Sequence, residues 1–147
     1  MNNYFNEKSF QSIDPKGRLL LPKDVRSAAK IGKGDVLYLL PNLAAPAYME
    51  IRTRKQWNAY LNNLRSGDGG ADKKDSFRYA MMAKEEMKVD GTGRVLIPTR
   101  IRVTCQLNGL VAVINMDSYI EVWNKGNVEQ RYADMIRAFK ETNDRMF

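Results

Sequence analysis

Histidine is absent from this sequence of 147 residues, and cysteine occurs once, as Cys105. The missing histidine removes the commonest general base, the usual catalytic triads and most zinc sites. A single cysteine can form neither an internal disulfide nor a cysteine cluster for a metal. Cys105 lies in an apolar helical pattern, which favours a small buried residue over a nucleophile. These absences argue against an enzyme with a small-molecule substrate, and no cofactor or metal is expected.

Long apolar runs are also lacking, and residues 1–8 do not show the basic-then-apolar pattern of a signal peptide. We therefore expect a cytoplasmic protein with no membrane partner. What the sequence does contain is an excess of positive charge: 24 Lys and Arg against 17 Asp and Glu, a formal net charge of +7. Such an excess points to a polyanion such as nucleic acid, although many basic proteins use their charge only for solubility.

The strongest feature of the sequence is a run that occurs twice, at residues 13–26 and 89–102. Both copies contain an acid, two variable residues, Gly-Arg, three aliphatic residues, a proline, two variable residues, an aliphatic residue and an arginine. The offset is 76 at both ends (90 − 14 and 102 − 26), so the copies align without a gap. Agreement over this length indicates an ancient duplication within the chain.

Each copy begins with a predicted turn, at residues 14–17 and 90–93. In the first turn proline fixes φ at the second position, and in both turns the closing glycine can accept a positive φ. The acid that opens each turn is expected to shape it, because no second acid lies nearby at a catalytic spacing. The turn-forming residues are therefore Asp14, Gly17, Asp90 and Gly93.

The rest of the chain predicts the same order of elements in each half: a hairpin, a short helix, a second hairpin and a longer helix. The expected strands are 8–13, 18–21, 35–40, 47–51, 86–89, 95–97, 110–114 and 119–123, and the expected helices are 22–31, one capped by Thr53, 77–83, 98–107 and one capped by Asn124. Residues 1–65 form the first half, 66–75 a glycine- and charge-rich linker, and 76–147 the second half. Each half is too small to bury both faces of its hairpins, so we expect the halves to intertwine in one domain.

The duplicated Asp-x-x-Gly-Arg run with its aliphatic triplet and proline, followed each time by a strand with tyrosine and glutamate and by a helix, resembles the MraZ family. These are bacterial transcriptional regulators related to AbrB-type DNA-binding proteins, and the similarity extends from about Phe10 to about Tyr132. The resemblance implies an α+β fold: a swapped-hairpin, AbrB-like, double-psi-type β-barrel built from two duplicated halves with flanking helices. It also implies a ring-like homo-oligomer, associated with the nucleoid, that binds tandem promoter repeats in double-stranded DNA and represses the division and cell-wall gene cluster.

The same resemblance implies that basic residues of the Asp-x-x-x-Arg motif contact the DNA. Carried over to this sequence, these are Lys16, Arg18 and Arg94. Thr92 stands where the first copy has Lys16, which weakens the second copy as a phosphate clamp. Two secondary candidates lie nearby, at positions that do not match between the copies: Lys23 and Arg100.

The residues alone leave a second explanation open for Arg18 and Arg94. Each could form an ion pair with the acid four residues earlier, Asp14 or Asp90, instead of reaching a partner. The planar fork of arginine suits guanine edges and phosphates. Both roles are compatible if the aspartate shapes the turn while the arginine extends outward.

Other prominent residues favour structural roles. Arg26 and Arg102 lie inside helices beside buried aliphatic residues, where each is expected to pair with an acid or a carbonyl. Trp57 and Trp123 belong to apolar patterns and are expected in the core or an interface.

For the whole protein, the leading hypothesis is a DNA-binding regulator without catalytic activity that blocks a promoter as an oligomer. The alternative is a non-enzymatic structural or protein-interaction module that uses the same barrel to oligomerise. The alternative predicts a stable oligomer with no DNA affinity above the nonspecific level.

Overall fold

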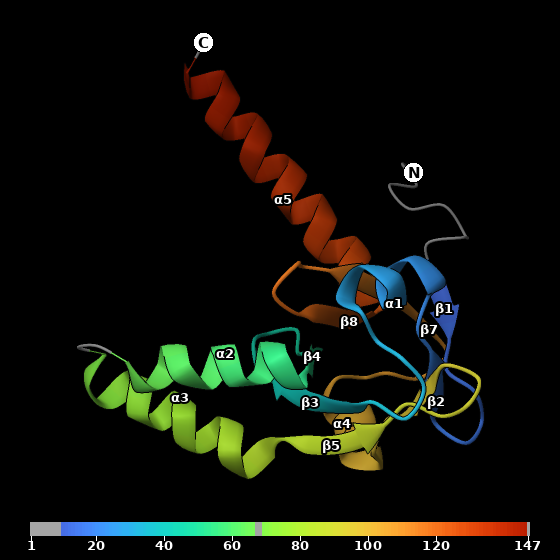
Figure 1. The fold of residues 1–147 in the computed structure, drawn as a ribbon. Coiled ribbons are helices and arrows are strands. Elements are labelled where there is room, and N and C mark those ends of the chain that lie inside the picture. The colour runs from blue at the N-terminus through green and yellow to red at the C-terminus, as the bar shows by residue number, and fades with distance from the viewer. Residues whose placement is uncertain (1–9, 67–68, 147) are drawn as a thin grey trace.

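The computed structural model describes residues 10–66 and 69–146, and this part of the chain is an α+β fold of eight strands and five helices (Figure 1). The strands are β1 (Phe10–Ser12), β2 (Arg18–Leu20), β3 (Val36–Asn42), β4 (Tyr48–Thr53), β5 (Glu85–Lys88), β6 (Arg94–Leu96), β7 (Leu110–Asn115) and β8 (Ile120–Asn124). The helices are α1 (Lys23–Ala29), α2 (Arg54–Arg65), α3 (Gly70–Ala83), α4 (Thr99–Thr104) and α5 (Lys125–Met146).

The strands of the two sequence repeats pair with each other. Six strands form one antiparallel sheet in the order β1-β7-β8-β4-β3-β5, so β1 pairs with β7 and β4 with β8. The remaining strands, β2 and β6, form a separate antiparallel pair in which Leu19 lies opposite Val95. Each repeat therefore obtains backbone hydrogen bonds from the other, which links the two duplicated runs directly.

The main core contains the first and third residues of the aliphatic triplet in each copy. Leu19, Leu21, Val95 and Ile97 have no exposed surface, whereas Leu96 is 43 % exposed. This alternation is expected of strands with one buried face.

Cys105 is also fully buried, as predicted, and burial raises the pKa of its thiol to about 11. The thiol is therefore protonated near neutral pH.

The glutamates of the two matching strands β4 and β8 lie opposite each other and are buried. Glu50 faces Glu121 in the register, and the two are 7 % and 8 % exposed. Glu50 forms a 2.8 Å ion pair with Arg52. Glu121 accepts hydrogen bonds from the Tyr119 hydroxyl (2.7 Å) and the Trp123 indole N–H (2.8 Å). Burial of these carboxylates is tolerated because each has hydrogen-bond donors; the expected burial of Trp123 is confirmed.

One helix begins earlier than the sequence suggested. The expected start was near Phe77, after a linker at 66–75, but α3 begins at Gly70. The glycines masked the helix-forming residues that follow them. Lys73 donates from its ammonium group to the carbonyls of Asn63 and Ser66 (3.4 and 3.1 Å) and so supports the end of α2. Positive charge at a helix C-terminus is favourable, and Phe77 and Ala80 of α3 add apolar packing against Trp57 and Leu61 of α2.

Two helix ends also differ from the prediction. The helix predicted at 98–107 ends at Thr104, because Gln106 takes a positive φ of 56°. In α1 the left-handed residue that ends the helix is Lys30, with a φ of 58°, rather than Gly32. The N–H of Ile31 then bonds to the carbonyl of Arg26 (2.8 Å), a Schellman-type ending that buries Ile31.

The long helices contact different strands of the sheet: α2 and α3 lie against β3 and β4, and α5 lies against β7 and β8. In Figure 1, α2 and α3 lie side by side beyond β3 and β4, and α5 projects away from the sheet. The predicted caps are confirmed: Thr53 forms a capping box with Gln56, and Asn124 accepts from the N–H of Asn127 (3.0 Å). In the described part of the chain, no helix combines the length and the apolar character needed to span a bilayer.

Candidate nucleic-acid interface

The first repeated turn is built around the carboxylate of Asp14. Its Oδ1 atom accepts hydrogen bonds from the backbone N–H groups of Lys16 and Arg18, both at 2.9 Å. The N–H of Gly17 donates to the carbonyl of Asp14 at 2.9 Å, and Gly17 adopts a φ of +88°. Only glycine takes this conformation without strain, so the acid and the glycine determine the turn.

The second turn repeats this geometry. Asp90 Oδ1 accepts from the backbone N–H groups of Thr92 (2.8 Å) and Arg94 (2.9 Å). The N–H of Gly93 donates to the carbonyl of Asp90 at 3.1 Å, and the φ of Gly93 is +85°. The two copies of the motif therefore share one backbone conformation.

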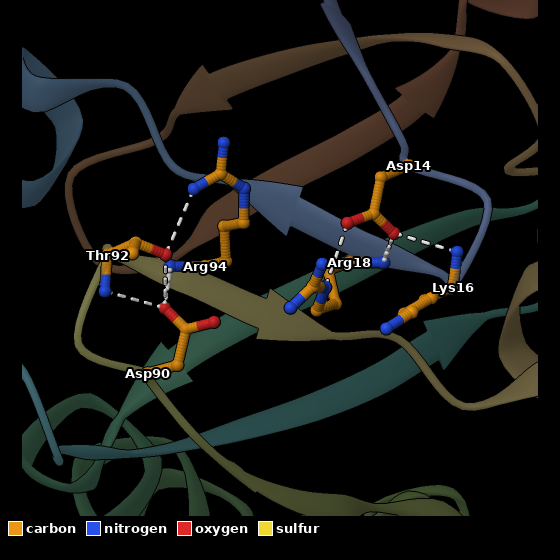
Figure 2. A network of polar contacts seen from close by, with 6 residues as sticks. All are labelled: Asp14, Lys16, Arg18, Asp90, Thr92 and Arg94. Carbon is orange, nitrogen blue, oxygen red and sulfur yellow. Dashed lines mark hydrogen bonds and ion pairs between the residues drawn. The ribbon is translucent and has the colours of Figure 1, made fainter.

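The arginines that follow the turns have different partners (Figure 2). Arg18 Nε forms an ion pair with Asp14 Oδ2 at 2.8 Å, and the Arg18 side chain remains 42 % exposed. Arg94 Nη1 instead donates to the Thr92 hydroxyl at 2.9 Å, and that hydroxyl donates to Asp90 Oδ1 at 2.7 Å. A hydroxyl can donate and accept at once, so Thr92 links the arginine to the acid. The sequence suggested only the loss of a basic residue at this position.

Both turn carboxylates are held in the ionised form. The pKa of Asp14 is lowered, chiefly by the hydrogen bond from the Arg18 backbone N–H. The pKa of Asp90 is lowered to about 2, first by the Thr92 hydroxyl, then by the backbone N–H groups of Arg94 and Thr92, with a further contribution from the charge of Arg18. Hydrogen bonds to a carboxylate favour its charged form, so each turn keeps its acceptor at neutral pH.

The pairing of β2 with β6 brings the two arginines to one face. Arg18 lies opposite Leu96, and Arg94 lies opposite Leu20. Residues opposite each other share a face, so all four side chains project from the side away from the buried Leu19 and Val95. Arg18 and Arg94 are diagonal neighbours in this register, a relation that places the two residues about 7–8 Å apart, with their Cβ atoms somewhat closer. We call this pair of strands the β2–β6 ribbon.

The other basic candidates differ in their surroundings. Lys16 is exposed at the first turn, and Lys23 is exposed at the start of α1. Arg100, at the start of α4, donates to Glu85 Oε1 at 2.9 Å and to the carbonyl of Ala83. Arg100 is thus directed towards β5 and the end of α3, and its charge is shared with Glu85.

Arg26 and Arg102 pair with carbonyls, as predicted. Arg26 Nε donates to the carbonyl of Leu21, and Arg102 Nε donates to the carbonyl of Ile97, both at 2.9 Å.

The two copies of the repeated run carry the same net charge. Residues 14–26 contain four basic and two acidic side chains, and residues 90–102 contain three basic and one acidic. Each copy therefore has a net charge of +2. In the part of the chain that the structure describes, no cluster of three or more His, Cys, Asp or Glu could bind a metal ion.

Comparison with known proteins identifies relatives along nearly the whole chain. The model of the MraZ protein family, whose description also reads antitoxin-like, matches residues 4–77 and 80–147. A protein of Legionella pneumophila named Transcriptional regulator MraZ is 32% identical over 116 residues, 78% of this chain and 75% of the relative. Proteins of the same name from Mycoplasmoides gallisepticum and Lachnoclostridium phytofermentans are 28% and 26% identical, over 81% and 83% of this chain and 80% and 82% of their own lengths. With both copies of the Asp-x-x-Gly-Arg run inside the matched segments, the chain belongs to the MraZ family.

Proposed function

We propose that the protein is a sequence-specific regulator of transcription that binds double-stranded DNA through the β2–β6 ribbon. One observation carries the proposal: Arg18 and Arg94, from two distant parts of the sequence, share the outer face of a two-stranded antiparallel ribbon. The major groove of B-DNA is about 12 Å wide and admits a ribbon of this kind. The relatives named as transcriptional regulators support the same conclusion.

Each arginine keeps N–H donors that its partners within the protein do not use and that can bind a base. Asp14 holds Arg18 through Nε, so both Nη groups remain as donors, and Thr92 holds Arg94 through Nη1 alone. An arginine fork that donates to O6 and N7 of guanine is the commonest specific contact in the major groove. We assign base contacts to these two arginines and phosphate contacts to Lys16 and Lys23, which position the protein.

The proposal also concerns the closure of the sheet and the assembly of several copies of the chain. We infer that the strands close into the swapped-hairpin barrel that the family resemblance implies, and that copies of the chain assemble into a ring. A ring engages tandem promoter repeats at high effective concentration, so individually weak contacts add up to tight binding. Occlusion of the promoter of the division and cell-wall genes would then repress them, in the cytoplasm at the nucleoid.

The test is a binding titration against duplex DNA that the protein itself has selected from a random-sequence pool. Arg18→Ala and Arg94→Ala should each weaken binding by about tenfold to a hundredfold, since a good bidentate base contact contributes about 1–3 kcal/mol of discrimination. Arg65→Ala on α2 removes the same charge from an exposed site away from the ribbon and should change little. Unchanged affinity for both ribbon variants would overturn the assignment.

A protein-interaction module is the second candidate, and α5 favours it. The helix projects from the sheet (Figure 1). Met135, Ile136 and Phe139 form an apolar stripe on α5, in which Met135 and Ile136 are partly exposed and Phe139 is 62 % exposed. An exposed apolar stripe on a helix is typical of a surface that meets another protein. Sizing combined with the DNA titration separates the candidates: a stable oligomer that selects no sequence from the pool would support the module and exclude the regulator.

A further inference from the structure

Each repeated turn is in contact with an arginine from the opposite copy. A Cβ atom built on Gly17 would lie 2.7 Å from Cζ of Arg102, which belongs to α4. A Cβ atom on Gly93 would lie 2.8 Å from Nη1 of Arg26, which belongs to α1. The guanidinium groups therefore occupy the space that the missing side chains leave, and the contacts cross between the copies in both directions.

Backbone hydrogen bonds follow the same crossed pattern. The N–H of Ile97 donates to the carbonyl of Gly17 at 2.9 Å, while the carbonyl of Ile97 accepts from Arg102 Nε at 2.9 Å. One strand-end residue thus connects the arginine to the turn of the other copy, and the guanidinium lies against that turn.

The reciprocal unit has equivalent bonds. The N–H of Leu21 donates to the carbonyl of Gly93 at 3.3 Å, and the carbonyl of Leu21 accepts from Arg26 Nε at 2.9 Å. Gly17 and Gly93 immediately precede Arg18 and Arg94, so a displacement of either turn displaces the arginine that follows it.

We propose that Arg26 and Arg102 are positioning residues that hold the DNA-reading turn of the opposite copy: Arg102 acts through Arg18, and Arg26 acts through Arg94. The role rests on the DNA-binding function proposed above. Arginine suits it because its planar head can lie flat against a glycine peptide while Nε donates to a carbonyl. Lysine has no flat head and presents a compact, strongly hydrated charge instead.

Double-variant cycles test this crossed coupling. Arg102→Lys keeps the charge but removes the planar contact, and it should weaken binding to the selected duplex by about tenfold, within the range measured for coupled residues. In an Arg18→Ala background the same change should have less than about a twofold further effect, because the side chain through which Arg102 acts is already gone. In an Arg94→Ala background the full tenfold loss should persist.

The mirror cycle uses Arg26→Lys, which should lose its effect in the Arg94→Ala background and keep it in the Arg18→Ala background. All variants are compared at a low salt concentration, where both alanine backgrounds still bind measurably. Equal losses in the two backgrounds would show a direct DNA contact or a general loss of structure, and either result overturns the proposal. Unchanged affinity of the two lysine variants for the selected duplex would overturn the proposal as well.

Hydrogen exchange of the free protein provides a second readout that needs no DNA. In Arg102→Lys the amide of Gly17 should exchange faster while the amide of Gly93 is unchanged, and Arg26→Lys should give the reverse. Equal changes at both glycines, or none, would contradict the positioning role. If the crossed exchange pattern appears in a protein that binds no specific DNA, the regulator function fails while the positioning of the turns stands.

Discussion

The two repeated turns have one backbone and two different sets of side-chain contacts. In the first turn Lys16 is exposed and Arg18 forms an ion pair with Asp14. In the second, Thr92 replaces the lysine and connects Arg94 to Asp90 (Figure 2). The comparison teaches that the acid and the glycine determine the turn, whereas the residue between them is free to set how the neighbouring arginine is held. We infer that the first copy adds a phosphate contact, whereas the second holds its arginine through a hydroxyl rather than directly through the acid.

The largest effect is expected when both copies lose their arginine. Arg18→Ala with Arg94→Ala removes two contacts of about 1–3 kcal/mol each, so specific affinity should fall by at least about thirtyfold. Competition of the selected duplex against unrelated DNA measures the loss. Arg54→Ala with Arg65→Ala, two exposed arginines of α2, is the matched control. A double ribbon variant that still prefers the selected duplex would show that the two copies do not form the reading surface.

The glycines of the two turns should have the next largest effect. Gly17→Ala and Gly93→Ala place a side chain at a positive φ, which costs about 1–2 kcal/mol, and the new Cβ also displaces a guanidinium. Thermal unfolding measures the decrease in Tm. Gly34→Ala is the control, because Gly34 has a φ of +81° and a Cβ there would meet nothing within 4 Å. Equal decreases in all three variants would mean that the contacts with Arg26 and Arg102 do not contribute.

Lys16 distinguishes the copies by charge. Lys16→Ala should weaken binding by a similar factor for all DNA sequences, and should reduce the slope of log K against log salt by about 0.9, the value for one phosphate contact. Lys55→Ala, an exposed lysine on α2, should leave the slope unchanged. A sequence-dependent loss in Lys16→Ala would instead assign this lysine to a base.

The smallest effect concerns the pH dependence of the second turn. The pKa of Asp90 is lowered from 3.8 to about 2, so the stability that its carboxylate contributes is complete above the unfolded-state pKa and is lost as the pH falls towards 2. Thr92→Val removes the largest cause, and the pKa of Asp90 should rise towards its ordinary value. Carbon-13 NMR titration of the carboxylates measures the pKa values of Asp14 and Asp90. The control variant Thr92→Ser keeps the hydroxyl and should retain the low pKa of Asp90. An unchanged pKa of Asp90 in Thr92→Val would show that the backbone N–H groups alone keep the carboxylate ionised.

Local chemistry made much of the fold predictable. Asp and Gly at fixed positions specify the turns, the aliphatic triplets specify the strands at 18–21 and 95–97, and the caps at Thr53 and Asn124 follow from single residues. Which members of each triplet are buried follows from the pleat of the strands and not from the apolar pattern. Helix α3 was missed at its start because its stability comes from packing and hydrogen bonds with α2, which no local pattern records.

The candidate site was only partly predictable, because its defining contacts join residues that are far apart in the sequence. The motif identified Arg18 and Arg94 separately, but only the strand register places them on one face. The approach of Arg102 to Gly17 joins one copy of the repeat to the other, and the Thr92 hydroxyl acquires its role from the orientation of Arg94. A usable signal did exist: each copy retains a glycine and an arginine at matching positions, which is the pattern that a reciprocal contact between duplicated units requires.

Hydrogen exchange of the protein with and without the selected duplex tests most directly whether the β2–β6 ribbon is the DNA interface. We expect DNA to protect the amides of residues 14–20 and 90–96 together, while those of α2 and of the exposed end of α5 exchange at their free rates. Protection of both turns to the same degree would further show that the copies bind as one surface. Protection confined to α2 or α5, with exchange at both turns unchanged, would contradict the assignment of the β2–β6 ribbon as the DNA interface.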